Sequence, residues 1–597
     1  MNINTIYVII CKIYGQLGGV NMGYTTSGKY SSANKTYTQM PSVANIAREV
    51  KNHLGVGMAE KEWQENPELA SRKFLHIDAY NRFLNKDTLI LLGRTGTGKT
   101  SILKSIEFNV NNKKCNEYTD VVLDEFTDLF NILLKQPDDE SESQIMYKME
   151  EIIDVAVHTL VMVHFAKKYS DCNELNNVRN YLNEHGLYTT NRIRSFVNNI
   201  FEKFRIDSDK AGAKTYNTLT DFYNFIRGEL CVRYEDAKNE LMEFLKDKSV
   251  IVLFDSLNKY DIRQKNEVLA VKALISTCFS FYVNNSKTHI YLKIALPSEV
   301  HTRVLDSLPG KQQGNTVLIQ WKYKELISFA ALRLFYWLTE QNAQYNSLNI
   351  RFIEQFQSDN FLLGNEKGYE NSKKLLANIL PDTCPTCFMF EFDTLSYCMR
   401  HTLKKPREVL TIFNALIEEL IIKKDMAYLK DNPSKIKDVV HSTQEFMIKS
   451  ALSMYESSFE AINDACFVVL SSSKFVFSLN DIRAKLKEAA ANVKNGDYDK
   501  DEILRILFES GLVGVINEVR HIDNPPDKFK TKEPFDFIIA NFEYQIKGRI
   551  IPTLSDQYVV HPMCYEYYRC LVDNCSMVYP NRFADEDDII STILKDN

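Results

Sequence analysis

The residues with the clearest chemical use lie in a glycine-rich stretch that follows the apolar run Leu89–Leu92. The stretch has the form G-x-x-x-x-G-K-T, and a helix-like segment comes directly after it, which is the context that a phosphate-binding loop requires. Glycines let backbone N–H groups gather around a polyphosphate, and the following helix adds its positive N-terminal end. We therefore expect a nucleoside triphosphate to bind to Gly93, Arg94, Thr95, Gly96, Thr97, Gly98, Lys99 and Thr100.

Two side chains of this loop have distinct expected roles. Lys99 is expected to reach the β- and γ-phosphates, and the hydroxyl of Thr100 to hold Mg²⁺. An acidic side chain at the end of a nearby strand must complete the metal site. Asp255 follows the apolar run Val250–Phe254, so it stands at a strand's carboxyl end, where α/β sheets bind ligands.

A competing acid comes earlier in the chain. Asp124 and Glu125 follow the apolar residues Val121–Leu123 and form the acid pair that many ATPases use. Asp124 lies only about 25 residues after Lys99, which leaves barely enough chain for one helix and a turn. We therefore favour Asp255 and keep Asp124 as the alternative.

One motif points to guanine instead of adenine. Asn258-Lys259-Tyr260-Asp261 matches N-K-x-D, with which GTPases read guanine. In those proteins the Asn ends its own strand and a D-x-x-G ends an earlier one. Here Asn258 comes three residues after Asp255, and the D-x-x-G at 209–212 follows no apolar run. ATP is therefore the expected nucleotide, and GTP is the alternative.

Composition limits the class of protein. The 597 residues are enough for roughly three or four domains, and 45% hydrophobic with 25% charged residues is ordinary for globular proteins. The formal net charge of −6 argues against a protein that coats nucleic acid. Twelve cysteines are scattered through a chain without a secretion signal, so we expect reduced thiols and a cytoplasmic location.

The order of apolar patterns predicts an α/β fold. Strand-like runs at 88–92, 118–123, 249–255 and 290–296 alternate with helical patterns, and 126–246 is helical throughout. We expect an ATPase domain at 42–318 with a helical insertion at about 126–246, and an all-helical lid at 319–440. We expect a further domain at 441–580, a disordered or loop extension at 1–41 whose true start is Met1 or Met22, and an acidic tail at 581–597.

No stretch is expected to enter a membrane. The apolar run Ile6–Ile10 is too short to span a bilayer. The longer run Ile152–Ala166 contains Asp154, His158 and His164, so we expect a buried helix there.

Over about residues 75–570 the chain resembles AAA+-lineage ATPases of the STAND and origin-initiator type, including bacterial P-loop ATPases encoded in phage-defence loci. The phosphate loop is close to the GRxGTGKT form of that group. The resemblance implies a three-layer P-loop domain that uses ATP and Mg²⁺. STAND proteins follow the acid-bearing strand with D-G-h-D-E, whereas this chain has D-S-L-N-K at 255–259. The usual water-activating carboxylate is missing there, so we expect slow hydrolysis or use of the nucleotide as a switch.

The resemblance also assigns residues beyond the loop. Trp321, with Glu325, Leu326 and Arg333, is similar to the W…EL…R segment that opens the lid, although an amphipathic helix with a core Trp explains the same spacing. His401–Arg407 is similar to the lid element H-T-x-x-x-P-R, in which the Arg, here Arg407, acts as sensor 2 and reaches the γ-phosphate. A surface Arg beside a helix-starting Pro is the alternative. Ser298 is the candidate for sensor 1, and Arg303 for a residue that points to a neighbouring subunit.

The C-terminal region resembles a winged helix. Phe477–Ile482 and Asp501–Leu507 open helices, Gly511–Ile516 turns back into a strand, and Val559–Met563 closes the unit. Winged helices of initiator relatives bind DNA, but acidic residues outnumber basic ones from 440 to the end. DNA is therefore a possible partner that charge does not support, and we favour contacts with protein.

Four side chains have spacing that suits a structural zinc ion. Cys384, Cys387, Cys398 and His401 give C-x₂-C-x₁₀-C-x₂-H. A helical cysteine is, however, usually a small hydrophobic residue, and His401 already belongs to the lid element. The four residues therefore have two interpretations, as ligands of a structural zinc ion or as ordinary core and lid residues.

Together these features predict an ATP-binding and ATP-hydrolysing switch that oligomerises with copies of itself or remodels a partner. The resemblance implies a role in antiviral defence, and since no nuclease, protease or TIR-like element is apparent, the effector is expected to be a separate protein. A DNA-loading initiator or transposition ATPase is one alternative. A nucleotide-bound scaffold without hydrolysis is the other.

Overall fold

The computed structural model describes residues 37–39, 51–55, 59–125, 129–130, 133–134, 140–188, 218–255, 265–299, 304, 315–341, 351–361, 366–386, 391–456, 458–492, 499–529, 531, 533–543, 557–573 and 575–580.

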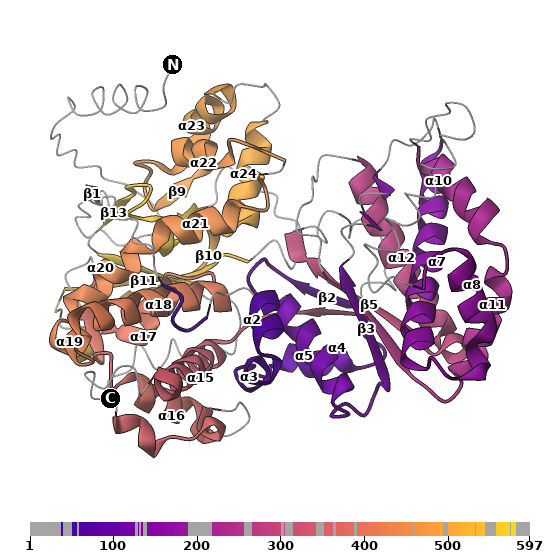
Figure 1. The fold of residues 1–597 in the computed structure, drawn as a ribbon. Coiled ribbons are helices and arrows are strands. Elements are labelled where there is room, and N and C mark those ends of the chain that lie inside the picture. The colour runs from indigo at the N-terminus through magenta and orange to yellow at the C-terminus, as the bar shows by residue number, and fades with distance from the viewer. Residues whose placement is uncertain are drawn as a thin grey trace.

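A parallel sheet of five strands carries the glycine-rich loop (Figure 1). The strands are β2 (Ile90–Gly93), β3 (Asp120–Glu125), β4 (Val250–Asp255), β5 (Ile290–Pro297) and β6 (Thr316–Leu318), and their order is β3-β4-β5-β2-β6. Consecutive strands β3, β4 and β5 lie on one side of β2, and β6 lies on the other. The order changes direction at β2, which is where open α/β sheets bind ligands. The expected α/β class with a parallel sheet is confirmed.

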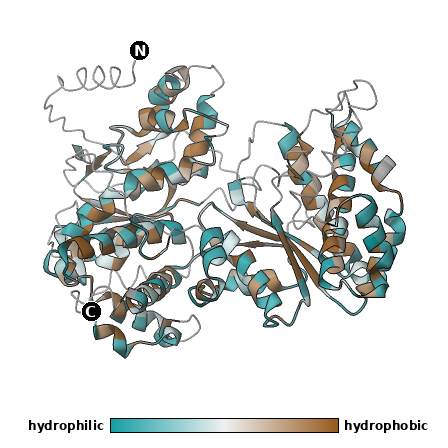
Figure 2. Ribbon diagram, viewed as in Figure 1, coloured by the Kyte–Doolittle hydropathy of each residue, from teal (hydrophilic) through white to brown (hydrophobic). Residues whose placement is uncertain are grey.

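Both faces of this sheet are covered, because alternate side chains of each strand enter two different cores. On β4, Ile251 and Leu253 belong to the core that contains helix α5 (Lys99–Asn111). Val252 and Phe254 belong to the core that contains α7 (Glu142–Lys168) and α12 (Lys265–Thr288). The sheet is therefore the middle of three layers, and Figure 2 shows its strands as hydrophobic against the hydrophilic outer surfaces of the helices.

The segment expected to be an insertion builds one of these layers. It contains α7, α8 (Asn176–Glu184), α10 (Leu219–Phe225) and α11 (Tyr234–Phe244), and α7 packs along α12 on the sheet. By length and composition α12 is the one described helix that could cross a membrane, but more than half of its apolar window is buried and it packs on β5 and α7. Its hydrophobicity is therefore explained by its place in the core.

The region after β6, which was expected to form an all-helical lid and is called the lid below, is mainly helical. Helix α15 (Tyr323–Gln341) packs on α16 (Glu366–Leu376) and α18 (Pro406–Lys423), and α17 (Thr394–Arg400) precedes α18. Short helices α19 (Tyr428–Asp431) and α20 (Ser434–Ser442) complete the lid. The expectation of an all-helical lid is wrong at one place. Strands β7 (Thr383–Pro385) and β8 (Glu391–Asp393) form a small antiparallel pair, too short to give an alternating pattern in the sequence.

The C-terminal module packs a second sheet against helices. Helices α21 (Gln444–Leu452) and α22 (Ile462–Leu470) are followed by β9 (Val476–Ser478), α23 (Leu479–Asn492) and α24 (Lys500–Glu509). Strands β10 (Val513–Ile522), β11 (Phe535–Asn541), β12 (Gln557–Val560) and β14 (Ser576–Pro580) join β9 in the order β14-β11-β10-β12-β9.

Part of the N-terminal extension is ordered, contrary to expectation. Strand β1 (Tyr37–Gln39) pairs antiparallel with β13 (Leu571–Asp573) of the C-terminal module. The strand is specified by a partner more than 500 residues away, which supplies hydrogen bonds that no local pattern reveals. The remainder of 1–41 and the tail at 581–597 lie outside the described residues.

Candidate functional site

The glycine-rich loop connects β2 to α5 in the expected strand–loop–helix order. Gly98 is the N-cap of α5 with φ +98°, and Gly96 has φ +88°. These left-handed conformations favour glycine because a Cβ would be strained there. Gly93 is needed for space, since a Cβ on it would lie 2.4 Å from Oγ1 of Thr97. The backbone of this loop therefore depends on each of its three glycines.

The side chain of Lys99 lies inside the glycine-rich loop, where it contacts backbone carbonyl oxygens. Its side chain is 7% exposed, and Nζ donates to the carbonyl oxygens of Gly93 at 2.9 Å and Arg94 at 3.3 Å. Burial lowers the pKa of Lys99 to about 8, and the carboxylates of Glu299 and Asp255 oppose this effect. The ammonium group is therefore placed beside the loop, where an anionic phosphate would compensate for its desolvation.

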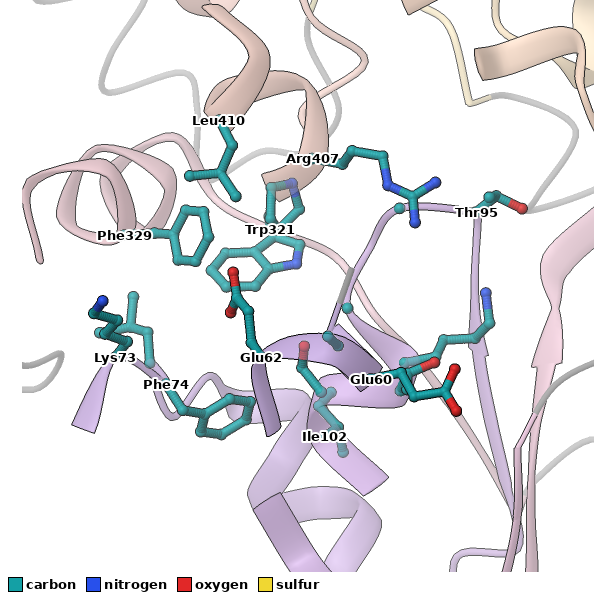
Figure 3. Close-up of a pocket in the computed structure, with 18 of the residues that line it drawn as sticks. Glu60, Glu62, Lys73, Phe74, Thr95, Ile102, Trp321, Phe329, Arg407 and Leu410 are labelled. Carbon is teal, nitrogen blue, oxygen red and sulfur yellow. The ribbon is translucent and has the colours of Figure 1, made fainter. Parts of the chain in front are cut away.

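A cavity of about 530 Å³ opens at the loop (Figure 3). That volume is within the range of small-molecule sites. Thr95, Gly96, Gly98, Lys99 and Thr100 line it, so most of the expected phosphate-binding residues face a single space.

The expected metal ligands line the same cavity. Thr100 supplies a hydroxyl from the first turn of α5, and Asp255 supplies a carboxylate from the end of β4. Oxygen donors of this kind suit Mg²⁺. Asp124 is the penultimate residue of β3, which is one strand farther from the loop than β4, and it is not among the described residues that line the cavity. The donor set fits a magnesium ion at Thr100 and Asp255.

Two residues of the lid contact the loop, although more than 200 residues separate them from it in the sequence. Nε1 of Trp321 donates to the carbonyl oxygen of Thr97 at 2.8 Å. The backbone N–H of Arg407 donates to the carbonyl oxygen of Gly96 at 3.4 Å, and a Cβ on Gly96 would lie 3.2 Å from Cβ of Arg407. Arg407 also lines the cavity, and burial lowers its pKa. The region expected to be the lid therefore contacts the glycine-rich loop through both elements that the resemblance singled out.

The part of the cavity away from the loop carries aromatic and aliphatic side chains that were not foreseen from the sequence, and the charged Glu62 and Lys73 lie beside them. Figure 3 shows Trp321, Phe329 and Leu410 of the lid facing Phe74 across it. These side chains form a surface suited to a planar base. The sequence did not single out Phe74, because one aromatic residue near helices is typical of any hydrophobic core.

An ion pair ties the wall of this cavity together. Nη1 of Arg333 contacts both carboxylate oxygens of Glu62, at 2.9 and 2.8 Å, and donates to the carbonyl oxygen of Leu54 at 3.4 Å. Gly55 has φ +117°, and a Cβ on it would lie 2.2 Å from Oε1 of Glu62. Arg333 of the expected W…EL…R segment thus joins α15 to α2 (Ala59–Glu65). The partner Glu62 was not identified from the sequence.

Arg94 differs from the other loop residues, because its side chain leaves the site. Its guanidinium is buried and donates to the carbonyl oxygens of Ser510 at 3.4 Å and Phe542 at 3.1 Å, both in the C-terminal module. Thr97 is also internal, with Oγ1 donating to the carbonyl oxygen of Arg94 at 2.7 Å. These two side chains therefore shape and anchor the loop, while Thr95, Gly96, Gly98, Lys99 and Thr100 line the cavity.

Ser298 is buried directly after β5, the strand beside the loop strand β2. Its hydroxyl donates to Oε2 of Glu299 at 3.2 Å. The other expected residues of this region lie outside the described residues: they are Arg303 and the N-K-x-D segment at 258–261.

The residues considered for zinc do not assemble into a metal site in the part of the chain that the structure describes. Cys384 and Cys398 are buried, and burial raises the pKa of the Cys384 thiol to about 12 and that of Cys398 well above its usual value. Nδ1 of His401 lies 2.8 Å from the carbonyl oxygen of Tyr397. Cys387 lies outside the described residues, and those that are described contain no group of three His, Cys, Asp or Glu suited to a metal ion.

The fold and the site define a three-layer α/β protein with a glycine-rich loop, a helical lid and a cavity between them. Comparison with known proteins found no relative of this chain. No protein-family model matches it, and no curated protein matches its sequence.

Proposed function

We propose that this protein binds ATP with Mg²⁺ in the cavity at the glycine-rich loop and hydrolyses it. One observation carries the proposal. Lys99 and Thr100 are neighbours, but Asp255 and Arg407 come from two other segments far along the chain, and all four residues line one cavity of suitable size. A glycine-rich turn that matched the motif by chance would not gather a hydroxyl, a carboxylate and two cations around itself.

Each residue has a defined task in this proposal. Lys99 and the backbone N–H groups of the loop bind the β- and γ-phosphates, and Thr100 with Asp255 holds Mg²⁺, which supplies charge neutralisation on the phosphates when bound. Arg407 contacts the γ-phosphate and reports its presence to the lid through α18. The lid position therefore depends on the state of the nucleotide.

The switch is proposed to act on other proteins. The GRxGTGKT loop and the lid elements support an AAA+ or STAND-like ATPase that works as a homo-oligomer in the cytoplasm, with a separate effector in antiviral defence. In the C-terminal module the order α22-β9-α23-α24-β10-β11 supports a winged helix. Its excess of acidic residues favours protein partners over DNA, so an initiator or transposition ATPase remains the second candidate.

Phosphate release tests this proposal directly. The purified full chain is given ATP and GTP in parallel, with Lys99→Ala as the matched variant. We expect release from ATP that the substitution abolishes. Release from GTP alone would favour the N-K-x-D interpretation. Binding of ATP without release would favour the scaffold alternative, and absence of binding to either nucleotide would overturn the proposal.

A further inference from the structure

The nucleotide proposed for this cavity has two ends, and its base must lie at the end away from the loop. Lys99 and Thr100 line the loop end, where the phosphates are proposed to bind. Trp321 connects the two parts of the cavity, since its Nε1 donates to the carbonyl oxygen of Thr97 at 2.8 Å and its ring centroid lies 5.5 Å from that of Phe329. The polar side chains beside these aromatic rings therefore decide which base is bound.

Two side chains of this part of the cavity are both charged and largely buried. They are Glu62 of α2 and Arg333 of α15, which line the cavity with side chains 18% and 10% exposed. Figure 3 shows the Glu62 carboxylate directed toward Trp321 and Phe329, on the side of the cavity away from Thr95. Hydrogen bonds to buried groups discriminate strongly between ligands, because a ligand that cannot make them leaves a polar group unpaired.

Helix α2 and the residues after it bring other polar side chains to the cavity, but these are less suited to reading a base. Glu60, Lys61 and Gln64 are exposed, so water competes for their hydrogen bonds. Lys73 is less exposed, but its Nζ lies 3.3 Å from Oε1 of Glu340, which is not among the described residues that line the cavity. The buried ion pair is therefore the group best placed to distinguish one base from another.

The ion pair is fixed in place but has hydrogen-bonding capacity left. Nη1 of Arg333 contacts both oxygens of Glu62, at 2.9 and 2.8 Å, and donates to the carbonyl oxygen of Leu54. A carboxylate has about four lone-pair sites, so the contacts with Nη1 leave each oxygen able to accept another hydrogen bond. Nε of Arg333 is buried and has no hydrogen-bond partner among the described residues. The two residues thus offer a base one acceptor and one donor, side by side.

This combination of groups matches adenine at position 6 of the purine ring. Adenine carries an amino group there, which donates, next to ring nitrogens that accept. Guanine carries a carbonyl oxygen at the same position, which would face the negative charge of Glu62 without a hydrogen atom between them. Guanine reaches a carboxylate only through its other edge, where N1–H and the 2-amino group donate.

We propose that Glu62 and Arg333 select adenine, an inference that rests on the proposed binding of ATP. An oxygen of Glu62 accepts a hydrogen bond from the 6-amino group, and Arg333 donates to the neighbouring ring nitrogen. The aromatic side chains beside the pair hold the plane of the base. Because Glu62 lies on α2 and Arg333 on α15 of the lid, the base is read where these two helices meet.

The experiment measures the equilibrium affinity of the full chain for ATP, purine riboside triphosphate and GTP. Purine riboside triphosphate lacks the 6-amino group and is otherwise identical to ATP, so it isolates the hydrogen bond to Glu62. We expect wild type to bind it at least about tenfold more weakly than ATP, because the buried carboxylate is left without that donor. GTP should also bind more weakly than ATP.

Glu62→Gln is the test variant, and Glu60→Gln is the matched control, because it removes an exposed carboxylate from the same helix and the same cavity. In Glu62→Gln we expect Arg333 to hold the amide oxygen, so that the amide N–H₂ faces the base and accepts nothing from the 6-amino group. The affinities for ATP and purine riboside triphosphate should then agree within about threefold. Glu60→Gln should keep the difference that wild type shows, and thermal unfolding midpoints establish that both variants are folded.

Three results would overturn the inference. The first is equal affinity of wild type for ATP and purine riboside triphosphate, and the second is tighter binding of GTP than of ATP. The third is a Glu62→Gln variant that keeps the difference of wild type, since another group would then choose the base. If Glu62→Gln does not fold, Glu62→Asp serves in its place: it keeps the charge beside Arg333 but withdraws the oxygens, so the difference should shrink. Failure of the proposed function is distinct, because wild type would then show no nucleotide binding that Lys99→Ala removes.

Discussion

The guanidinium of Arg94 occupies the space that a side chain at Gly511 would need. A Cβ on Gly511 would lie 2.5 Å from Nη1 of Arg94 and 3.1 Å from the carbonyl oxygen of Phe542. Gly511 lies between α24 and β10, whereas Arg94 is the second residue of the glycine-rich loop. The C-terminal module therefore holds the loop through a contact that depends on the absence of a side chain.

Gly511→Ala should loosen this contact. The substitution combines a close approach to Arg94 with a backbone φ of +81°, which disfavours alanine. We expect a loss of about 1–3 kcal/mol in stability, measured as a lower thermal midpoint. Gly228→Ala is the control, because a Cβ there meets nothing within 4 Å. Equal midpoints for the two variants would contradict the prediction.

Arg94→Ala should separate anchoring from nucleotide binding. The variant loses two charged hydrogen bonds to carbonyl oxygens, each of which contributes about 1.5–3 kcal/mol. We expect faster amide exchange around Ser510 and Phe542, measured by hydrogen–deuterium exchange. ATP affinity should change little, because the Arg94 side chain points away from the cavity. Complete loss of ATP binding would show that the side chain has a direct role at the phosphates.

The parts that the sequence predicts well are those with a local signature. Strands β2, β4 and β5 are apolar runs bounded by polar residues, because they are buried on both faces. The loop could be located because its glycines adopt backbone conformations that other residues disfavour. The resemblance assigned Trp321 and Arg407 to lid elements, and the structure places both in contact with the glycine-rich loop.

The parts that it did not predict depend on distant partners. Arg94 donates to backbone carbonyl oxygens more than 400 residues away, and a carbonyl has no sequence signature. The position of β5 beside β2 follows from the strand order, which no local pattern encodes. Strand β1 has three residues and forms against β13, so its pattern is too short to recognise.

Arg407→Ala should weaken ATP binding. Its side chain lines the cavity, while its contact with Gly96 uses the backbone N–H and survives the substitution. Loss of a charged hydrogen bond to phosphate costs about 1.5–3 kcal/mol, so we expect affinity to fall about ten- to hundredfold in equilibrium titration. Arg505→Ala is the control, because that arginine lies on α24 and pairs with Glu509 at 2.7 Å. Unchanged affinity in Arg407→Ala would remove this residue from the site.

Lys293 should make stability depend on pH. This lysine of β5 is fully buried, and its Nζ donates to the carbonyl oxygens of Phe83 at 2.7 Å and Asn85 at 2.6 Å. Burial lowers its pKa from 10.5 to about 7, with Asp87 and Cys115 opposing the shift. Between these two values the unfolded chain holds a proton that the folded chain lacks, so stability rises with pH. The slope is at most about 1.4 kcal/mol per pH unit, and below pH 7 it vanishes because both states are protonated.

Lys293→Met tests this dependence, because methionine has a similar length but does not titrate. The variant should be less stable overall, since the carbonyl oxygens at the end of α4 (Asp78–Leu84) lose their donor. The informative quantity is the difference in unfolding midpoint between wild type and variant at several values from about pH 7 to 9. We expect the unfolding midpoint of wild type to rise relative to that of the variant as pH increases. The exposed Lys287→Met should show no such trend, and a constant difference for Lys293→Met would mean that the buried amine keeps its proton throughout this range.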